Sequence, residues 1–170
     1  MPDQAFDAED CESRTARLSR IAEADAIFPI PEAGYAIGGG METGVAFVEA
    51  RRAYIEGLWL CTIFAAVAAI ERHIAAGLFV PGHNWVFKAD FSALLEQAES
   101  LGRISAFERT KYSEIAKLRN DYARFQKPTE MIDRLIEAGE RGLGLNEILQ
   151  DDARMALTLA ASYFLRNCGT

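Results

Sequence analysis

The sequence predicts an all-α protein, most simply an antiparallel bundle of four or five helices in one domain. Three observations support this class. Apolar side chains recur at three- and four-residue steps over several segments, cap and stop residues separate these segments, and no segment alternates for long enough to make a strand. Half of the 170 residues are apolar, which suffices for one domain with a real core but not for two domains.

The first 42 residues are expected to precede the bundle as a tail and a connector. Residues 1–12 carry five acidic side chains and no basic one, which favours a disordered tail. A short helix is predicted over 13–28, and the prolines and glycines of 29–40 favour a connector. The helical bundle is therefore expected to cover residues 43–168.

The longest helix is predicted to begin at Thr43, as its N-cap, and to run to about Ala76, where Gly77 provides a stop. It is apolar around most of its circumference, so more than one neighbouring helix must cover it. Small side chains near its end allow such a neighbour to approach closely. Its main apolar stripe consists of Phe47, Ala50, Tyr54, Leu58, Cys61, Ala65, Ala68 and Ala69.

Two further helices are predicted in the middle of the chain. Asp90 is expected to cap a helix that ends near Gly102. Another helix is predicted over 105–126, because Ser105 and Glu108 match a capping box at its start.

The remaining elements follow from turn and stop residues. Residues 78–88 favour a loop, and Pro128 stops the preceding helix. A short helix is predicted over 129–138, and glycines between 139 and 144 favour a turn. The last helix is expected from Asn146 to near Asn167.

The charge of the chain is unevenly distributed. A formal net charge of −7 argues against a general nucleic-acid coat. The segment 103–127 reverses this balance, since it carries seven basic and three acidic side chains. Such a run is either a solvated helix face or the electrostatic footprint of a phosphate-binding surface.

Cysteines, apolar runs and metal-ligating residues indicate the cellular setting. The three cysteines are odd in number and widely spaced, which fits a reducing cytoplasm better than a disulfide framework or zinc knuckle. The longest uncharged run, 57–70, has fourteen residues and is too short to span a bilayer. We therefore expect a cytoplasmic protein without a membrane span. No metal or other cofactor is expected, because Glu71 and His73 lack the spacing of a di-metal helix motif.

The most informative segment lies near the end of the helix predicted over 105–126, and it reads Leu118-Arg119-Asn120-Asp121-Tyr122-Ala123-Arg124. Arg119 follows Ile115 by four residues, so its guanidinium lies beside a core face, where an unpaired charge is costly. A carboxylate, carbonyl or phosphate must therefore meet it. Either Glu71 is that partner, or Glu71 pairs with its own neighbours at the end of its helix.

This segment and the helix order resemble the HEPN superfamily of small helical bundles over roughly residues 45–166. The resemblance rests on the motif helix, the short helix before it, the terminal helix and an Ala-rich helix with Tyr54-Ile55-Glu56-Gly57 and Ala68-Ala69-Ile70-Glu71. It implies that Arg and His of an Arg-Asn-x-x-x-His motif meet across a dimer interface and cleave single-stranded RNA without metal. In that chemistry the ribose 2′-hydroxyl attacks its own phosphate, His transfers protons, and Arg stabilises the phosphorane.

Carried onto this chain, Arg119 and Asn120 match the motif, Tyr122 fills an intervening position, and Arg124 stands in place of the histidine. A guanidinium stays protonated at physiological pH, so Arg124 binds phosphate but does not act as acid and base in turn. The resemblance therefore implies a non-catalytic module that binds RNA or a protein partner and forms a homodimer near the motif helix. The expected binding residues are Arg119, Asn120, Tyr122, Arg124 and Glu71, and of these Arg119, Asn120 and Arg124 are expected to border one cleft.

Two alternatives remain at this point. One is an active, metal-independent endoribonuclease of toxin–antitoxin or phage-defence type that works without the motif histidine. The two histidines of the chain, His73 and His83, lack the family's spacing to Arg119. The other alternative is an unrelated helical interaction protein, in which Arg119 and Arg124 only pair with nearby carboxylates or with a subunit partner.

Overall fold

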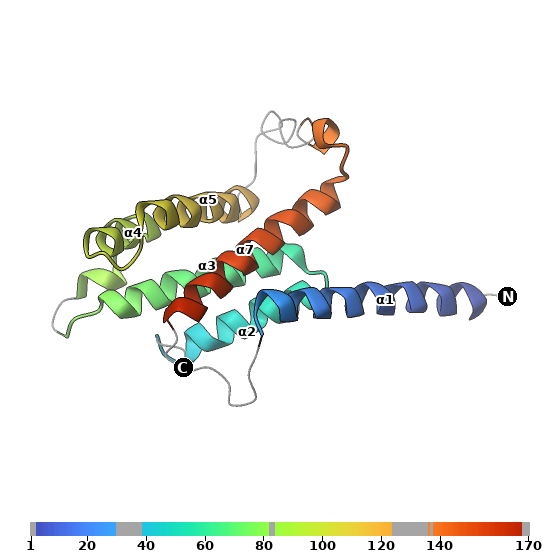
Figure 1. Ribbon diagram of the computed structural model, residues 1–170, viewed down its shortest axis with the longest axis horizontal. Helices are drawn as coiled ribbons and strands as arrows, with labels where there is room; N and C mark the ends of the chain where they lie inside the picture. Colours follow the sequence, from blue (N-terminus) through green and yellow to red (C-terminus); the bar gives the residue numbers. More distant parts are fainter. Residues whose placement is uncertain (1–2, 30–38, 82–83, 124–135, 137, 168–170) are drawn as a thin grey trace.

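The computed structural model describes residues 3–29, 39–81, 84–123, 136 and 138–167. It confirms the predicted all-α class, because the described part contains helices and no β-strand element (Figure 1). The elements in chain order are α1 (Asp3–Ile27), α2 (Met41–Ile55), α3 (Trp59–Leu78), the 3-10 helix η1 (Asn84–Phe87), α4 (Phe91–Ser100), α5 (Ala106–Ala123) and α7 (Leu145–Asn167).

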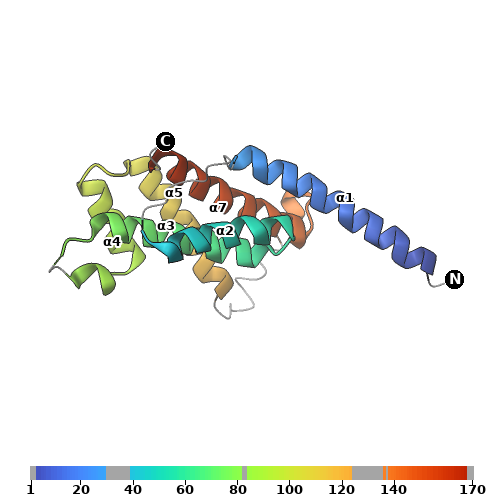
Figure 2. The same ribbon diagram turned by 90° about the horizontal axis from the view of Figure 1, so that it is seen from below.

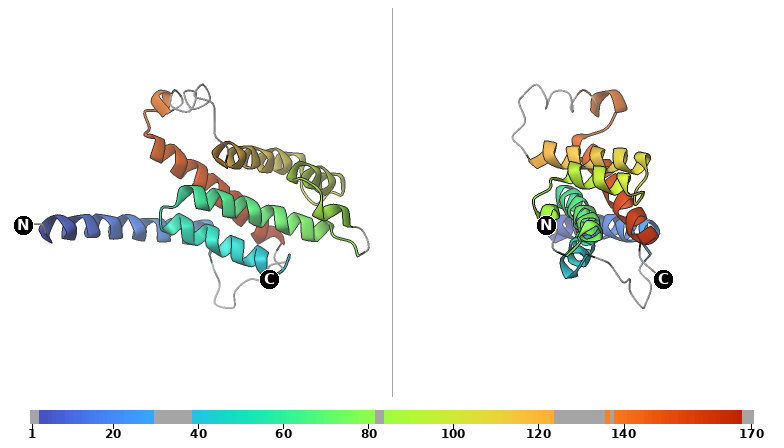
Figure 3. Two further views of the ribbon diagram at one scale, coloured as in Figure 1. Left: turned by 180° about the vertical axis from the view of Figure 1, so that it is seen from behind. Right: turned by 90° about the vertical axis from the view of Figure 1, so that its left-hand side faces the viewer.

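The helix α3 forms the centre of the bundle. It contacts α2, α7, α4 and α5, and the end-on view shows these helices around it (Figure 3). Its side chains Ile63, Val67 and Ile70 are completely buried. This confirms that more than one neighbour covers the most apolar helix. By length and composition alone, α3 is also the one described helix that could cross a membrane, a test that buried core helices pass as well.

The single helix predicted over 43–76 is instead two antiparallel helices, α2 and α3, joined by residues 56–58. Gly57 has a φ of +76°, which favours glycine, and the Leu58 amide donates to the Ala53 carbonyl at 2.8 Å. The prediction was wrong because the apolar spacing continues across this turn, whereas the backbone conformation at Gly57 reverses the chain.

Two predicted helix ends are also wrong by a few residues. α2 begins two residues before Thr43, whose Oγ1 donates to the Gly39 carbonyl at 2.7 Å and so does not act as the N-cap. α3 continues through Gly77 and ends at Leu78. At Thr43 the residue expected as the cap lies within the helix, and at Gly77 the helix continues one residue beyond the expected stop.

The caps predicted for α4 and α5 are confirmed. Asp90 Oδ1 accepts from the Ala93 amide at 2.8 Å. At the start of α5, the Ser105 amide donates to Glu108 Oε2 at 2.8 Å, and the Glu108 amide donates to Ser105 Oγ at 3.2 Å. These reciprocal contacts fix where the two helices of the α4–α5 hairpin begin.

The last predicted elements are described only in part. The helix predicted over 129–138 lies almost entirely outside the described residues. α7 begins at Leu145, one residue before the predicted Asn146. The side-chain oxygen of Asn146 accepts from Trp59 Nε1 at 3.0 Å, which ties the start of α7 to the start of α3.

α1 is much longer than the short helix predicted over 13–28, because residues 3–12, expected as a disordered tail, are helical. The first half of α1 extends beyond the bundle (Figure 2). The second half packs on α2 and α7, where Phe28 joins the common core. Part of the segment expected to precede the bundle thus contributes to its core.

Candidate functional site

Two of the motif residues, Arg119 and Asn120, lie on the wall of a polar cleft between α4 and α5. The cleft has a volume of about 550 Å³. The first turns of α4 form one wall, and the second half of α5 forms the other, because the two helices run antiparallel. The lining residues are Asp90, Phe91, Ser92, Leu95, Ser113, Ala116, Lys117, Arg119, Asn120 and Asp121.

Arg119 is held by two partners. Its Nη1 donates to Glu71 Oε2 on α3 at 2.9 Å, and its Nε and Nη2 donate to Asn120 Oδ1 at 3.4 and 3.3 Å. The two charged side chains are only 26% and 31% exposed, so water screens their attraction incompletely. This confirms the prediction that the Arg119 guanidinium, beside the core face, has a partner. Of the two roles considered for Glu71, the structure shows the pairing with Arg119.

These contacts leave donor groups on Arg119. A guanidinium carries five N–H groups, and the contacts to Glu71 and Asn120 use one hydrogen each on Nε, Nη1 and Nη2. One further hydrogen remains on each of Nη1 and Nη2. Because Arg119 lines the cleft and its orientation is already fixed, these donors meet an acceptor there with little loss of conformational entropy.

The charges that line the cleft balance one another. Lys117 and Arg119 are opposed by Asp90 and Asp121, and Glu71, which pairs with Arg119 but does not line the cleft, adds a third carboxylate, so that the five side chains together carry a net charge of −1. A ligand in this cleft is therefore selected by directed hydrogen bonds more than by net charge. The N-cap bond of Asp90 also commits one of its oxygens to the Ala93 amide.

The basic run 103–127 does not form a continuous positive patch in the described part. Arg109 pairs with Glu99 at 2.9 Å, and Lys111 pairs with Glu114 at 2.8 Å. Arg103 donates to a backbone carbonyl at the end of α3. These partners favour the solvated-face interpretation for the first half of α5 and leave the cleft as the place where basic groups meet a hollow surface.

Tyr122 and Arg124, the other expected binding residues of the motif segment, are not among the described lining residues of the cleft. The Tyr122 hydroxyl donates to Asp152 Oδ2 on α7 at 2.6 Å, and the ring packs against the core. Tyr122 therefore connects α5 to α7. Arg124 lies outside the described residues, so its place near the cleft stays a prediction.

His73 lies away from the cleft. Its ring centroid lies 5.2 Å from that of Tyr163 and 5.1 Å from that of Phe164, both nearly perpendicular to it. Glu71 and His73 are two positions apart on α3, about 200° around the helix, so they point to different neighbours. Tyr163, whose ring contacts that of His73, is itself buried, and this burial raises the pKa of Tyr163 to about 12. The other histidine, His83, lies outside the described residues.

The α4 wall of the cleft was not predicted from the sequence. Asp90 was identified only as a cap, and Ser92 and Leu95 gave no signal. Their position depends on how α4 packs against α5, which no local pattern encodes. Lys117 was recognised as part of the basic run, but its two-residue separation from Arg119 does not indicate a shared helix face.

Neither metal ligation nor a known relative adds to this site. Within the described ranges, no group of three or more His, Cys, Asp or Glu side chains is arranged to hold a metal ion. Comparisons with protein-family models, with curated proteins and with solved structures give no match to this chain. The functional argument therefore depends on the geometry around Arg119.

Proposed function

We propose that the chain is a non-catalytic, HEPN-like helical module that binds RNA at the α4–α5 cleft. The observation that supports it most directly is the Arg119 guanidinium, which Glu71 and Asn120 fix on the cleft wall with donors remaining on Nη1 and Nη2. A phosphate oxygen pair matches the planar geometry of such donors. Lys117 and two serine hydroxyls supply further contacts for a flexible strand.

The same geometry supports binding without cleavage. Attack by a ribose 2′-hydroxyl is assisted by a group that gives and takes protons near neutral pH, for which imidazole is best suited. The described lining of the cleft contains no imidazole, and position 124 carries Arg. General acid–base catalysis contributes about 10²–10⁴-fold. Without it, the remaining groups bind and orient RNA.

The balanced charge predicts modest RNA affinity with a weak dependence on salt. If Lys117 and Arg119 each neutralise one phosphate, the logarithm of the association constant falls with the logarithm of salt concentration with a slope of roughly −1.4 for a single strand. A much steeper slope indicates contacts beyond the cleft.

Fluorescence anisotropy with a labelled oligouridylate tests the proposal. Arg119→Ala removes charge-assisted hydrogen bonds and should weaken binding by about tenfold or more. Arg119→Lys keeps the charge but loses the planar fork, so its affinity should be intermediate. The matched control is Arg109→Ala, which removes one guanidinium from the same helix outside the cleft and should leave the affinity nearly unchanged. Circular dichroism checks that each variant is folded.

Each alternative gives a different result. RNA turnover in EDTA that Arg119→Ala abolishes identifies an endoribonuclease of toxin or phage-defence type and contradicts the non-catalytic proposal. If Arg119→Glu combined with Arg124→Glu leaves RNA binding unchanged but separates a dimer, the chain is a helical interaction protein. The dimer contact near the motif helix, implied by the resemblance, stays a prediction that this double variant also tests.

A further inference from the structure

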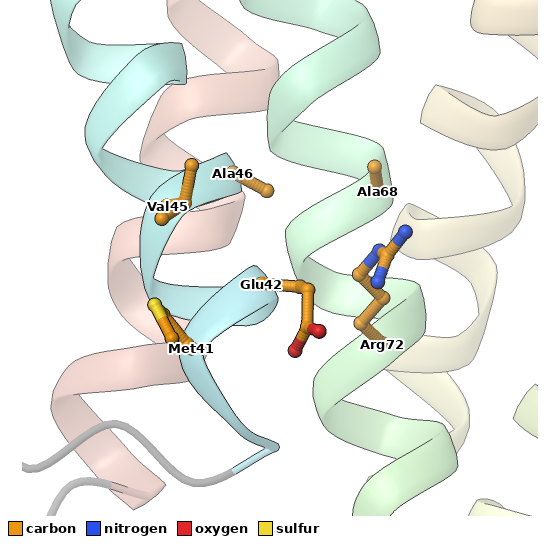
Figure 4. Close-up of a pocket in the computed structure, with 6 residues that line it drawn as sticks. All are labelled: Met41, Glu42, Val45, Ala46, Ala68 and Arg72. Atoms are coloured by element: carbon orange, nitrogen blue, oxygen red, sulfur yellow. The ribbon is translucent and has the colours of Figure 1, made fainter.

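The outer face of the α2–α3 hairpin carries an apolar groove. Its volume is about 380 Å³, and its lining residues are Met41, Glu42, Val45, Ala46, Ala68 and Arg72 (Figure 4). Met41 is 81% exposed and Val45 is 53% exposed. The faint red α7 lies behind α2 in this view, so the groove is on the side of the hairpin that faces away from α7. The groove thus leaves large apolar side chains of α2 in contact with water, and removing them from water would favour association.

The apolar strip continues along the hairpin beyond the groove. Val48 follows Val45 by three residues on α2 and is 57% exposed. On α3, Phe64 and Cys61 precede Ala68 by four and seven residues, and they are half-buried and exposed. Such spacing places each set on one helix face. Because α2 and α3 run antiparallel, the two sets lie side by side.

Two opposite charges flank one end of this strip. Glu42 projects from α2 across the groove, and Arg72 lies on α3 at the opposite wall (Figure 4). Both side chains are exposed. Within the described residues, neither has a hydrogen-bond or ion-pair partner. The groove therefore carries one acidic and one basic side chain at about the same level along the two helices. Neither forms an ion pair within the described part of the chain.

We infer that this face binds the same face of a second copy of the chain. A two-fold axis parallel to the helices places α2 of each copy on α3 of the other. Each residue keeps its level along the helix direction under this rotation. Glu42 of each copy then faces Arg72 of the partner. The long Met41 and the branched Val45 meet the small Ala68 of the partner, and the four helices form a bundle.

The groove is complementary to itself in both shape and charge. Its large exposed side chains stand on α2, and a small side chain stands opposite them on α3. A two-fold axis across the helices would place α2 on α2 and oppose large side chains to large ones, so the parallel axis is favoured. This inference does not depend on the Arg119 cleft, because Arg72 lies about 100° around α3 from Glu71, which pairs with Arg119.

Sedimentation equilibrium with single and mixed variants tests the inference. Glu42→Arg and Arg72→Glu each create two like-charge contacts across the interface, so each variant alone should dimerise at least about tenfold more weakly. Mixing the two variants should restore a dimer, since the new base at position 42 then faces the new acid at position 72. The matched control is Glu96→Arg on α4, which makes the same charge change and should dimerise like the wild type.

Three results would overturn the inference. A wild-type chain that remains monomeric into the millimolar range has no such interface. If the mixture stays monomeric while the double variant Glu42→Arg/Arg72→Glu dimerises, the two charges interact within one chain. If Val45→Asp, which places a charge in the middle of the strip, folds normally and leaves the dimer intact, the copies meet elsewhere.

Discussion

The α4–α5 cleft and the outer face of the α2–α3 hairpin lie on different sides of α3. They differ in whether their charged side chains form ion pairs within the chain. In the cleft, Arg119 has the carboxylate of Glu71 as a partner in the same chain. On the hairpin face, Glu42 and Arg72 have no partner in the described part of the chain and flank exposed apolar side chains. The first arrangement fits the proposed contact with a small group such as a phosphate, and the second fits the inferred contact with a second copy of the chain.

The two regions also draw on different sources of binding energy. The cleft offers directed hydrogen bonds, each worth about 1.5–3 kcal/mol when a charged group takes part. The hairpin face offers apolar area, worth about 25 cal/mol per Å² removed from water. Added salt should weaken RNA binding at the cleft and, through the inferred Glu42–Arg72 contacts, also pairing through the hairpin face, whereas the apolar part of that pairing should not respond to it. Variants that separate these two responses test the comparison most directly.

The largest effect is expected when the helix shared by both regions is weakened. Ile70 is completely buried on α3, next in sequence to Glu71. Ile70→Ala should lower the free energy of unfolding by about 2–5 kcal/mol, because it removes buried methyl groups and leaves a cavity. This is a large part of the roughly 5–15 kcal/mol that stabilises an ordinary domain. Both RNA binding and dimerisation should then be lost together on warming.

Urea unfolding measures this loss, and Leu101→Ala, at a half-exposed position after α4, is the control with an expected change below about 1 kcal/mol. Loss of only one activity in Ile70→Ala, with an unchanged unfolding midpoint, would show that the two regions do not share α3 as a common support.

The fold was predictable where the signal was local. The caps at Asp90 and at Ser105 were correct because each involves groups three residues apart in the sequence. The turn between α2 and α3 was missed because one glycine conformation, at Gly57, interrupts an apolar pattern that itself continues. The helical start of α1 was missed because the acidic composition of residues 1–12 was taken as disorder, although acidic composition alone does not exclude a helix.

The candidate site was predictable only on the helix that carries the motif. The position of Arg119 beside the apolar stripe required a partner, and pairing with Arg119, 48 residues away, was one of the two roles considered for Glu71. Asp152 as the partner of Tyr122, and Ser92 on the facing wall, depend on tertiary packing of α7 and α4. No spacing rule within one helix contains that information.

Smaller and opposite effects on RNA affinity and dimerisation are expected from substitutions at two consecutive positions of α3, Glu71 and Arg72. Glu71→Gln removes one negative charge beside Arg119, so RNA affinity at low salt should rise by about fivefold, or about 1 kcal/mol, and fall back at high salt. The free energy of unfolding should decrease by about 1 kcal/mol, since the pair is partly exposed. Dimerisation should not change.

Arg72→Gln is the matched variant for this experiment. It removes both ion pairs inferred across the dimer interface and should weaken dimerisation while leaving RNA affinity nearly constant. Anisotropy and sedimentation are measured on both proteins. If the two substitutions change both properties alike, the cleft and the hairpin face are one functional surface.

The smallest effect is expected for the stability of α5 at acidic pH. Glu108 lies in the first turn of α5, the helix that carries Arg119. Burial raises the pKa of Glu108, but hydrogen bonds from the Ser105 amide and hydroxyl and from Arg166 outweigh it and lower the pKa below its ordinary value of 4.5. A carboxyl group with a lower pKa in the folded state stabilises the fold above the unfolded value and loses this contribution as pH falls through the folded value.

Glu108→Gln should therefore be less stable than the wild type at pH 7, and this difference should shrink below about pH 4.5 as the wild-type carboxylate is protonated. Urea unfolding between pH 7 and pH 3 measures it, with the exposed Glu96→Gln on α4 as control. Because Glu108 caps α5, amide hydrogen exchange in its first turn should accelerate in acid before exchange in α2 does. A difference in stability that stays constant over this pH range would mean that Glu108 titrates alike in both states. In that case acidic pH would not destabilise α5, on the cleft side, more than α2 in the hairpin.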